Sequence, residues 1–189
     1  LDQFATYHPE VLDSFKRLAD TGCVEFLAET YYHSLSFLYS REEFNAQIEL
    51  HQKKMMELFG KKSTVFRNTE LIYNNDVARA AHELGYKAVI AEGADHLLGH
   101  RSPNFVYHPP GQQISVLLKN YRLSDDIAFR FGNRGWAEWP LSTEKFAGWV
   151  NQVNGCGYTV NLFMDYETFG EHQWTDTGIF EFLYHLPGA

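Results

Sequence analysis

Cysteine is scarce in this sequence. Cys23 and Cys156 are the only two among 189 residues, and they stand far apart, without the C-x-x-C spacing or the second pair that a zinc cage requires. We therefore expect reduced thiols, with Cys23 buried in a strand, in a cytoplasmic protein.

Long apolar runs and clusters of positive charge are also missing. No segment approaches the roughly 20 apolar residues that a membrane span needs, and no charged and then apolar leader opens the chain. Sixteen Lys and Arg stand against 24 Asp and Glu, for a net charge of −8, and they form no basic block. Phosphate binding needs clustered positive charge, so nucleic acid is excluded as the expected partner.

Hydrophobic and aromatic residues, by contrast, are plentiful. They make up 44% and 16% of the chain, enough to bury the core of a single domain over residues 1–189. Aromatic rings also stack on the apolar faces of sugars. The chain starts at Leu1 rather than Met and reads there like the interior of a longer protein, so we expect a fragment.

Hydrophobic periodicity predicts alternating strands and helices. The alternation predicts an α/β fold with parallel strands and outer helices. We expect helices over 8–19, 40–60 (capped by Ser40 and ended by Gly60), 74–85, 142–153 (capped by Ser142) and 177–185. We expect strands over 23–29, 63–70, 86–93, 105–108, 114–120 and 158–167, and a long loop over 93–113.

Several predicted strands end in a carboxylate. The acids at these ends are Glu29, Glu70, Glu92 and the pair Asp165 and Glu167. Taken alone, Glu92 is more simply read as a cap of the next helix. Because the carboxyl ends of parallel strands share one edge, we expect the acids to gather around one mouth.

Two of these acids have the differing surroundings that glycosidic hydrolysis requires. One carboxyl must protonate the departing oxygen while the other, ionised, meets the developing oxocarbenium ion. Glu70 follows Arg67 and Asn68, which we expect to hold an anion and lower its pKa. Asp165 lies among apolar and aromatic neighbours, so we expect burial to raise its pKa. Glu70 is thus the candidate nucleophile and Asp165 the candidate acid.

Three motifs resemble the conserved regions of one enzyme family. "VEFLAETYYHSLSFL" (24–38), "FRNTELIYN" (66–74) and "FMDYETFGEH" (163–172) are similar to the second, third and fourth regions of glycoside hydrolase family 57, in the form of its α-amylase members. The family folds as an incomplete (β/α)7 barrel and acts on α-glucans with retention. The resemblance therefore implies a partial (β/α)7 barrel.

The resemblance also implies roles for residues within these motifs. Glu70 would be the catalytic nucleophile and Asp165 the general acid/base. Glu29, His33, Glu167 and His172 would line the sugar site. The family's first region, a His-Gln-Pro stretch, and its fifth region are expected outside this chain, because the only His-Gln pair before Glu70, His51-Gln52, lies in a predicted helix.

Some candidates keep two interpretations. Arg67 is a candidate substrate-binding residue through its motif. Trp136 and Trp139 are either a stacking platform for glucose rings or packing residues, and the sequence favours neither interpretation. Arg134 and the pair Asp125-Asp126 are better read as solvated charges than as sugar ligands. The segment 93–113 is either a substrate wall or a cover for hydrophobic surface.

A metal site is not favoured, and no cofactor is expected. His96 and His100 have the four-residue offset of a zinc helix, but Leu97 occupies the position of the general base and Gly99 opposes a helix. His33, after a strand end, is expected to hold a carboxylate or a sugar hydroxyl, or to be structural.

The sequence thus predicts a retaining α-amylase-like glycoside hydrolase whose substrate is an α-glucan or maltooligosaccharide. Three alternatives stay open. A sugar hydroxyl as acceptor would make it a 4-α-glucanotransferase. A non-catalytic α-glucan-binding or truncated inactive relative would keep the groove without turnover. A metal-dependent hydrolase or deacetylase on a related barrel would need converging His and Asp ligands. The sequence gives no indication of oligomeric state.

Overall fold

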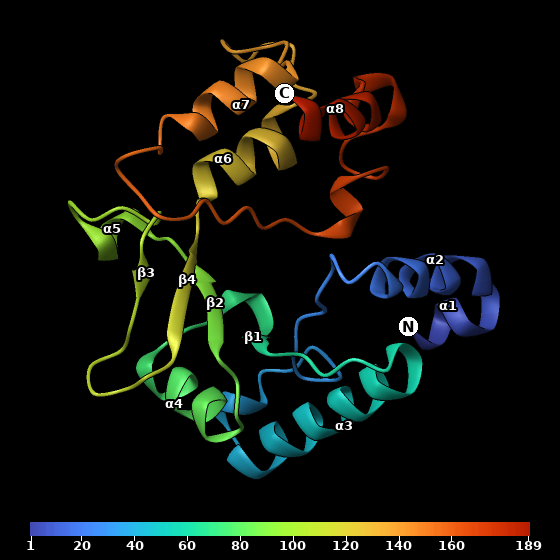
Figure 1. Ribbon diagram of the computed structural model, residues 1–189, viewed down its shortest axis with the longest axis vertical. Coiled ribbons are helices and arrows are strands. Elements are labelled where there is room, and N and C mark those ends of the chain that lie inside the picture. Colours follow the sequence, from blue (N-terminus) through green and yellow to red (C-terminus); the bar gives the residue numbers. More distant parts are fainter. The chain divides into compact units, whose positions relative to one another are not determined.

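The strands of the chain form one sheet. The computed structural model describes residues 1–189, and its 4-stranded sheet has the strand order β1-β2-β4-β3 (Figure 1). The strand bounds are β1 Val65–Arg67, β2 Ala88–Glu92, β3 Val106–Tyr107 and β4 Ser115–Lys119. β1 and β2 are parallel, with Val65 opposite Ala88. Each strand lies inside a segment that the sequence predicts as a strand, which confirms the α/β class.

Helices connect and cover these strands. Their bounds are α1 Asp2–Tyr7, α2 Pro9–Asp20, α3 Arg41–Phe59, α4 Asn75–Glu83, α5 Asp95–Leu98, α6 Tyr121–Asp125, α7 Thr143–Asn151 and α8 Ile179–His185, with a π-helical turn over Asp126–Arg130 after α6. The sequence predicts α2, α3, α4, α7 and α8. It misses α1, α5 and α6, which have 6, 4 and 5 residues, and α1 also buries none of its residues and so carries no apolar stripe.

Local capping groups explain where the predicted helices begin and end. The side chains of Ser40, Asn74 and Ser142 each accept a backbone N–H from the first turn of the helix that follows, in α3, α4 and α7 respectively. α3 ends at Gly60, which has a φ of 62° and so occupies the left-handed region that glycine enters without strain.

The chain divides into two compact units. Unit 1 contains residues 1–90 and 108–116, and unit 2 contains residues 91–107 and 117–189. The expectation of a single domain over the whole chain stays a prediction.

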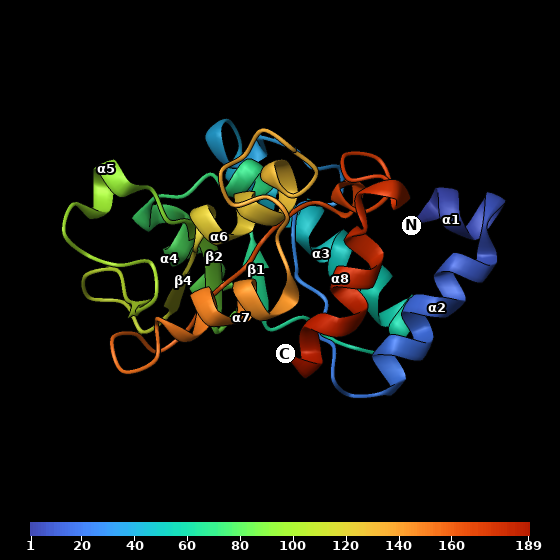
Figure 2. The same cartoon turned by 90° about the horizontal axis from the view of Figure 1, so that it is seen from above.

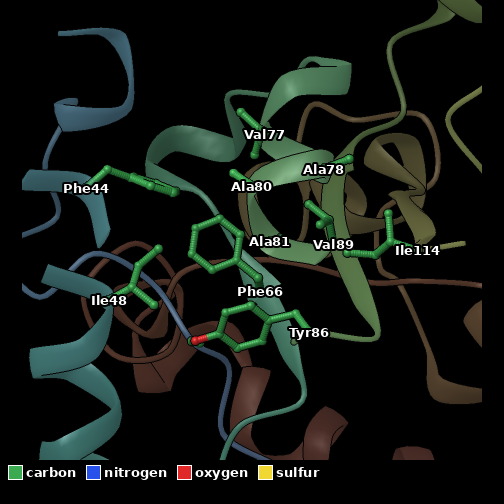
Figure 3. Close-up of a cluster of buried hydrophobic side chains, with 11 residues drawn as sticks. Phe44, Ile48, Phe66, Val77, Ala78, Ala80, Ala81, Tyr86, Val89 and Ile114 are labelled. Carbon is green, nitrogen blue, oxygen red and sulfur yellow. The ribbon is translucent and has the colours of Figure 1, made fainter. Parts of the chain in front are cut away.

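The main core of unit 1 joins α3 and α4 to the strands. Phe44 and Ile48 of α3 point toward Phe66 of β1, and α4 contributes Val77 and several alanines from the other side (Figure 3). The rings of Phe44 and Phe66 meet edge to face with their centroids 5.7 Å apart. Burying each such side chain contributes about 1.5–3 kcal/mol to folding, so this cluster anchors β1 and the segment that follows it.

Unit 2 has its own core around α7 and α8, which lie side by side in both ribbon views (Figures 1 and 2). Phe146 of α7 contacts Phe182 of α8 edge to face, with a centroid distance of 5.8 Å. Ile127, Phe131, Leu141 and Ile179 complete the buried cluster.

The predicted strand over 23–29 is wrong as a regular strand. It reduces to one parallel bridge between Ala28 and Phe66. The Thr64 N–H donates to the side chain of Glu25 at 2.7 Å, so it is not available to extend the ladder toward Cys23. Cys23 is consequently exposed rather than buried in a strand.

The predicted strand over 158–167 is wrong for a similar reason. It keeps a single parallel bridge, between Asn161 and Lys119. The backbone N–H of Tyr158 donates to the Asn104 carbonyl at 2.8 Å, and that of Phe163 donates to the Ser124 hydroxyl at 3.1 Å. Loop and side-chain oxygens thus take the donors that a continuous ladder would use.

The segment 93–113 is not one uninterrupted loop, since it contains α5 and β3. α5 ends at Leu98, and Gly99 follows with a φ of 61°, so His100 lies beyond the helix that carries His96. Among all the helices of the chain, none combines the length and the apolar character that crossing a bilayer would demand.

Candidate functional site

In unit 1, Glu29 and His33 are held by a bridge and a turn. The Ala28 N–H donates to the Val65 carbonyl at 2.9 Å, and the Arg67 N–H donates to the Ala28 carbonyl at 2.8 Å. Glu29 therefore directly follows the residue that is paired with β1. The chain then turns, with the His33 N–H donating to the Thr30 carbonyl at 3.1 Å.

Glu70 is positioned by the turn that follows β1. Buried Thr69 precedes it, and the Thr69 and Thr30 hydroxyls lie 3.0 Å apart. This buried contact ties the turn that carries Glu70 to the turn that carries His33. Glu70 itself has a φ of 54°, within a 3-10 turn over Thr69–Leu71. Its side chain is 71% exposed, which leaves the carboxylate open to a ligand.

The predicted residues of unit 1 meet in one chain of contacts. His33 Nε2 lies 2.8 Å from Glu70 Oε1, and Arg67 donates to Glu29 Oε2 at 2.9 Å. The same Arg67 nitrogen lies 3.4 Å from His33 Nδ1, which joins the two pairs. Glu29, His33, Arg67 and Glu70 are therefore neighbours, as expected for acids and their partners at one sheet edge.

The pKa of Glu70 is lowered, and the main cause differs from the sequence expectation. The hydrogen bond from His33 lowers it most, followed by the charge of His33, while Arg67 contributes less. Asn68 does not hold the Glu70 carboxylate. Its side-chain amide donates to the Ile72 carbonyl at 3.1 Å. The main group that lowers the pKa of Glu70 therefore comes from another motif.

In unit 2, the motif over 163–172 forms an exposed turn with buried anchors. Asp165, Glu167 and His172 are exposed. Thr168, which follows Glu167, and Gln173, which follows His172, are buried. The Gln173 N–H donates to the Thr168 carbonyl at 2.9 Å. These two anchors fix the backbone that presents the two acids and the histidine.

The expected burial of Asp165 is wrong. Asp165 is exposed, as are its neighbours Tyr166 and Glu167. Its apolar predecessors Phe163 and Met164 are half-buried, and Met164 packs against the core of unit 2 rather than over the carboxyl group. Desolvation therefore does not explain a role for Asp165 as an acid.

The two tryptophans differ in exposure. Trp136 is half-buried and packs edge to face on Trp149, with centroids 6.1 Å apart, which favours the packing interpretation. Trp139 is 43% exposed and lines a cleft of about 520 Å³ within unit 2. Neither Asp165 nor Glu167 lines that cleft, so the cleft gives no support to a shared sugar platform.

Glu92 at the end of β2 does not cap a helix. α5, the next helix, has no side-chain cap, and Glu92 instead lies 3.6 Å from Lys119 Nζ. Lys119, at the end of β4, also lies 3.9 Å from Asp125. The sequence analysis missed Lys119, although its place at a strand end beside acids was a usable signal.

No three His, Cys, Asp or Glu side chains gather in a way that could hold a metal ion. The offset of His96 and His100 carries no meaning here because α5 ends between them.

The profile described as "Glycosyl hydrolase family 57" matches residues 1–189. The chain belongs to that family. A curated relative from Methanocaldococcus jannaschii, named "Putative alpha-amylase", is 52% identical over 188 residues, which are 99% of this chain and 40% of the relative. This chain thus spans well under half of that family 57 relative.

Solved structures share the fold. A 4-alpha-glucanotransferase from Thermococcus litoralis superposes with a TM-score of 0.77 at 19% identity, over 98% of this chain and 29% of that one. A family 57 branching enzyme from Thermococcus kodakaraensis gives a TM-score of 0.73 at 13% identity, over 100% of this chain and 49% of that one. With the family membership, these likenesses confirm the predicted partial (β/α)7 barrel.

Proposed function

We propose that the protein carrying this chain hydrolyses α-1,4-glucosidic bonds of α-glucans with retention. The observation that carries the proposal is Glu70 itself. Its exposed carboxylate stands after β1 with a lowered pKa, inside a motif that matches the family's nucleophile region. The name of the 52% identical relative supports an amylase-like activity.

The proposed reaction is a double displacement. The Glu70 carboxylate attacks the anomeric carbon while the glycosidic C–O bond breaks, and Asp165 gives its proton to the departing oxygen. Asp165 then takes a proton from water, whose oxygen attacks the anomeric carbon and releases Glu70.

The remaining predicted residues are proposed to bind the α-glucan or maltooligosaccharide. Glu29, Glu167 and His172 would accept or donate hydrogen bonds to sugar hydroxyls. Trp139, exposed at 43%, is a better candidate for stacking than Trp136. Arg67, whose side chain is 11% exposed and paired with Glu29, would act on sugar through that acid rather than directly.

We also propose a cytoplasmic location for the protein. Cys23 and Cys156 are both exposed free thiols, which suits a reducing compartment. The net charge of −8 is consistent with a neutral partner rather than nucleic acid.

The proposal is tested by replacing the two acids. Glu70→Gln should abolish turnover of maltooligosaccharides, and Asp165→Asn should lower it by about 10²–10⁴-fold, as expected when a general acid/base is removed. Asp165→Asn should lose much less against a substrate whose leaving group needs no proton. Glu49→Gln and Asp176→Asn, exposed acids outside the motifs, are matched controls that should keep full activity.

The products separate the alternatives. Release of the α-anomer of shortened glucans supports the hydrolase, whereas longer glucans formed from two substrate molecules would make it a 4-α-glucanotransferase. Binding without turnover in the unmodified protein would instead favour a non-catalytic relative. Full activity in both Glu70→Gln and Asp165→Asn would refute the assigned roles.

A further inference from the structure

Two residues of the candidate site share an unusual backbone conformation. His33 has a φ of 52° and Glu70 a φ of 54°, in the left-handed region that residues with side chains rarely adopt. They come from different motifs, yet their side chains meet at 2.8 Å. Strained backbone of this kind persists only where surrounding contacts fix it, and it concentrates at functional sites. Leu71, the residue after Glu70, also has a positive φ, of 55°, so the strain is concentrated at these two turns.

Surrounding contacts do fix both turns. The Ser34 N–H donates to the Thr30 hydroxyl at 2.8 Å, which closes the turn around His33. The Thr30 and Thr69 hydroxyls, 3.0 Å apart, connect this turn to that of Glu70. The imidazole and the carboxylate are therefore held from behind by buried groups.

Both imidazole nitrogens of His33 are occupied. Nε2 faces Glu70 at 2.8 Å, and Nδ1 faces the Arg67 guanidinium at 3.4 Å. A guanidinium only donates hydrogen bonds, so Nδ1 beside it must accept, and the ring proton then sits on Nε2. No ring nitrogen is left for a sugar hydroxyl unless one of these contacts breaks.

We propose that His33 is a positioning residue for Glu70: its imidazole, with Nδ1 facing Arg67, donates the Nε2–H in a hydrogen bond to the Glu70 carboxylate. This inference rests on the proposed function, in which Glu70 is the nucleophile. The motif resemblance alone implied that His33 contacts the sugar. The proposal instead gives His33 a role in positioning the nucleophile.

The charged groups that face His33 within unit 1 are Glu70 at 2.8 Å, Arg67 at 3.4 Å and Glu29 at 3.8 Å. Arg67 lies closer to Nδ1 than Glu29 does, at 3.4 Å against 3.8 Å. Glu29 is itself paired with Arg67 at 2.9 Å. His51 of α3 is the next titratable group near Glu29, and burial lowers its pKa, so it adds no fixed positive charge. The hydrogen bond from His33 is the largest cause of the lowered pKa of Glu70, and the charge of His33 is the next.

The test compares His33→Asn with His33→Gln in the whole protein. Asparagine tolerates left-handed backbone, but its amide reaches only the position of Nδ1. Glutamine places an amide N–H near the position of Nε2 and does not titrate. We expect His33→Asn to lower kcat/KM by up to about 100-fold through misplacement of the nucleophile, and His33→Gln to restore much of it. His82→Gln, an exposed histidine on α4, is the control and should match the unmodified protein.

The pH profile gives a readout that a structural role would not move. Loss of the donor raises the pKa of Glu70 toward its ordinary value, so the acidic limb of kcat/KM should shift to higher pH in His33→Asn. The basic limb should stay in place. If His33→Gln lowers kcat/KM as much as His33→Asn does, with an unchanged midpoint of thermal unfolding, the proposal that His33 acts as a hydrogen-bond donor to Glu70 is wrong.

NMR keeps the inference separate from the proposed function. Signals of the His33 ring nitrogens should report the Nε2–H tautomer near neutral pH, and the labelled Glu70 carboxyl should titrate higher in His33→Asn than in the unmodified protein. These results would hold even in a protein without turnover. If the His33→Asn protein is active and the pKa of its Glu70 carboxyl is unchanged, His33 does not position Glu70, while the assignment of Glu70 as the nucleophile still stands.

Discussion

The hydroxyl groups of Thr30 and Thr69 lie 3.0 Å apart in a fully buried position behind the candidate nucleophile. Thr30 also accepts the Ser34 N–H at 2.8 Å. A buried polar group that loses its partner costs about 1–3 kcal/mol. We predict that Thr69→Val lowers the free energy of unfolding by about 1 kcal/mol and that Thr30→Val lowers it more, because it strands two partners. Urea unfolding measures both.

The double variant refines this prediction. Replacing both threonines by valine removes donor and acceptor together, so its cost should be less than the sum of the single costs. Thr175→Val, at an exposed position in unit 2, is the control and should change stability by less than about 0.5 kcal/mol. Strict additivity of the two single variants would show that the hydroxyls do not interact.

Replacing glycine by alanine should have opposite effects on stability at two positions in the helices. Gly60 ends α3 with a φ of 62°, whereas Gly148 lies inside α7, exposed and with open space where a Cβ would stand. Left-handed backbone costs a residue with a side chain about 1–2 kcal/mol, so Gly60→Ala should destabilise by that amount. Gly148→Ala should stabilise by about 0.5–1 kcal/mol, because alanine favours the helix interior.

Thermal unfolding checks the pair. Because the chemistry of the change is the same at both positions, each variant is the control for the other. An equal loss of stability at Gly60 and Gly148 would mean that backbone conformation does not decide the outcome, and the assigned ends of α3 would then be wrong.

Helices were more predictable than strands because their signals are local. Ser40 and Gly60 mark the ends of α3 within the same stretch of sequence that forms it. The strand predicted over 23–29 failed because the Glu25 side chain, in place of a carbonyl, accepts the N–H of Thr64, which lies far along the chain. Hydrophobic periodicity does not indicate which oxygen accepts a hydrogen bond from a backbone N–H. Of the predicted strand, only the bridge between Ala28 and Phe66 forms.

The candidate site was predictable in its residues and less so in its contacts. Acids at the ends of parallel strands were visible in the sequence, and Glu29 and Glu70 do lie at the same edge within unit 1. The sequence offered a carboxylate as one partner of His33 but did not indicate which one, because the contact with Glu70 depends on left-handed backbone at two residues that are not glycine. The expected burial of Asp165 failed since its apolar neighbours pack away from it.

The chain holds separate main cores in its two units, and this makes the predicted single domain testable. Phe44 is fully buried in the core of unit 1, and Phe146 is 1% exposed in the core of unit 2. β2 and β4 each contribute residues to both units, so the loss of either core should weaken strands that the other unit uses. Phe44→Ala and Phe146→Ala should each lower the free energy of unfolding by about 3–5 kcal/mol.

If the chain is one cooperative domain, both variants lower the same calorimetric transition, and amide exchange speeds up in both units for either variant. Phe129→Ala, at a side chain that is 65% exposed in unit 2, is the control and should shift the transition little. Two separate transitions, each sensitive to only one of the core variants, would contradict the single domain. The strands β2 and β4, which both units share, would then be too weak to transmit unfolding, and the two proposed catalytic acids would stand on independently stable parts.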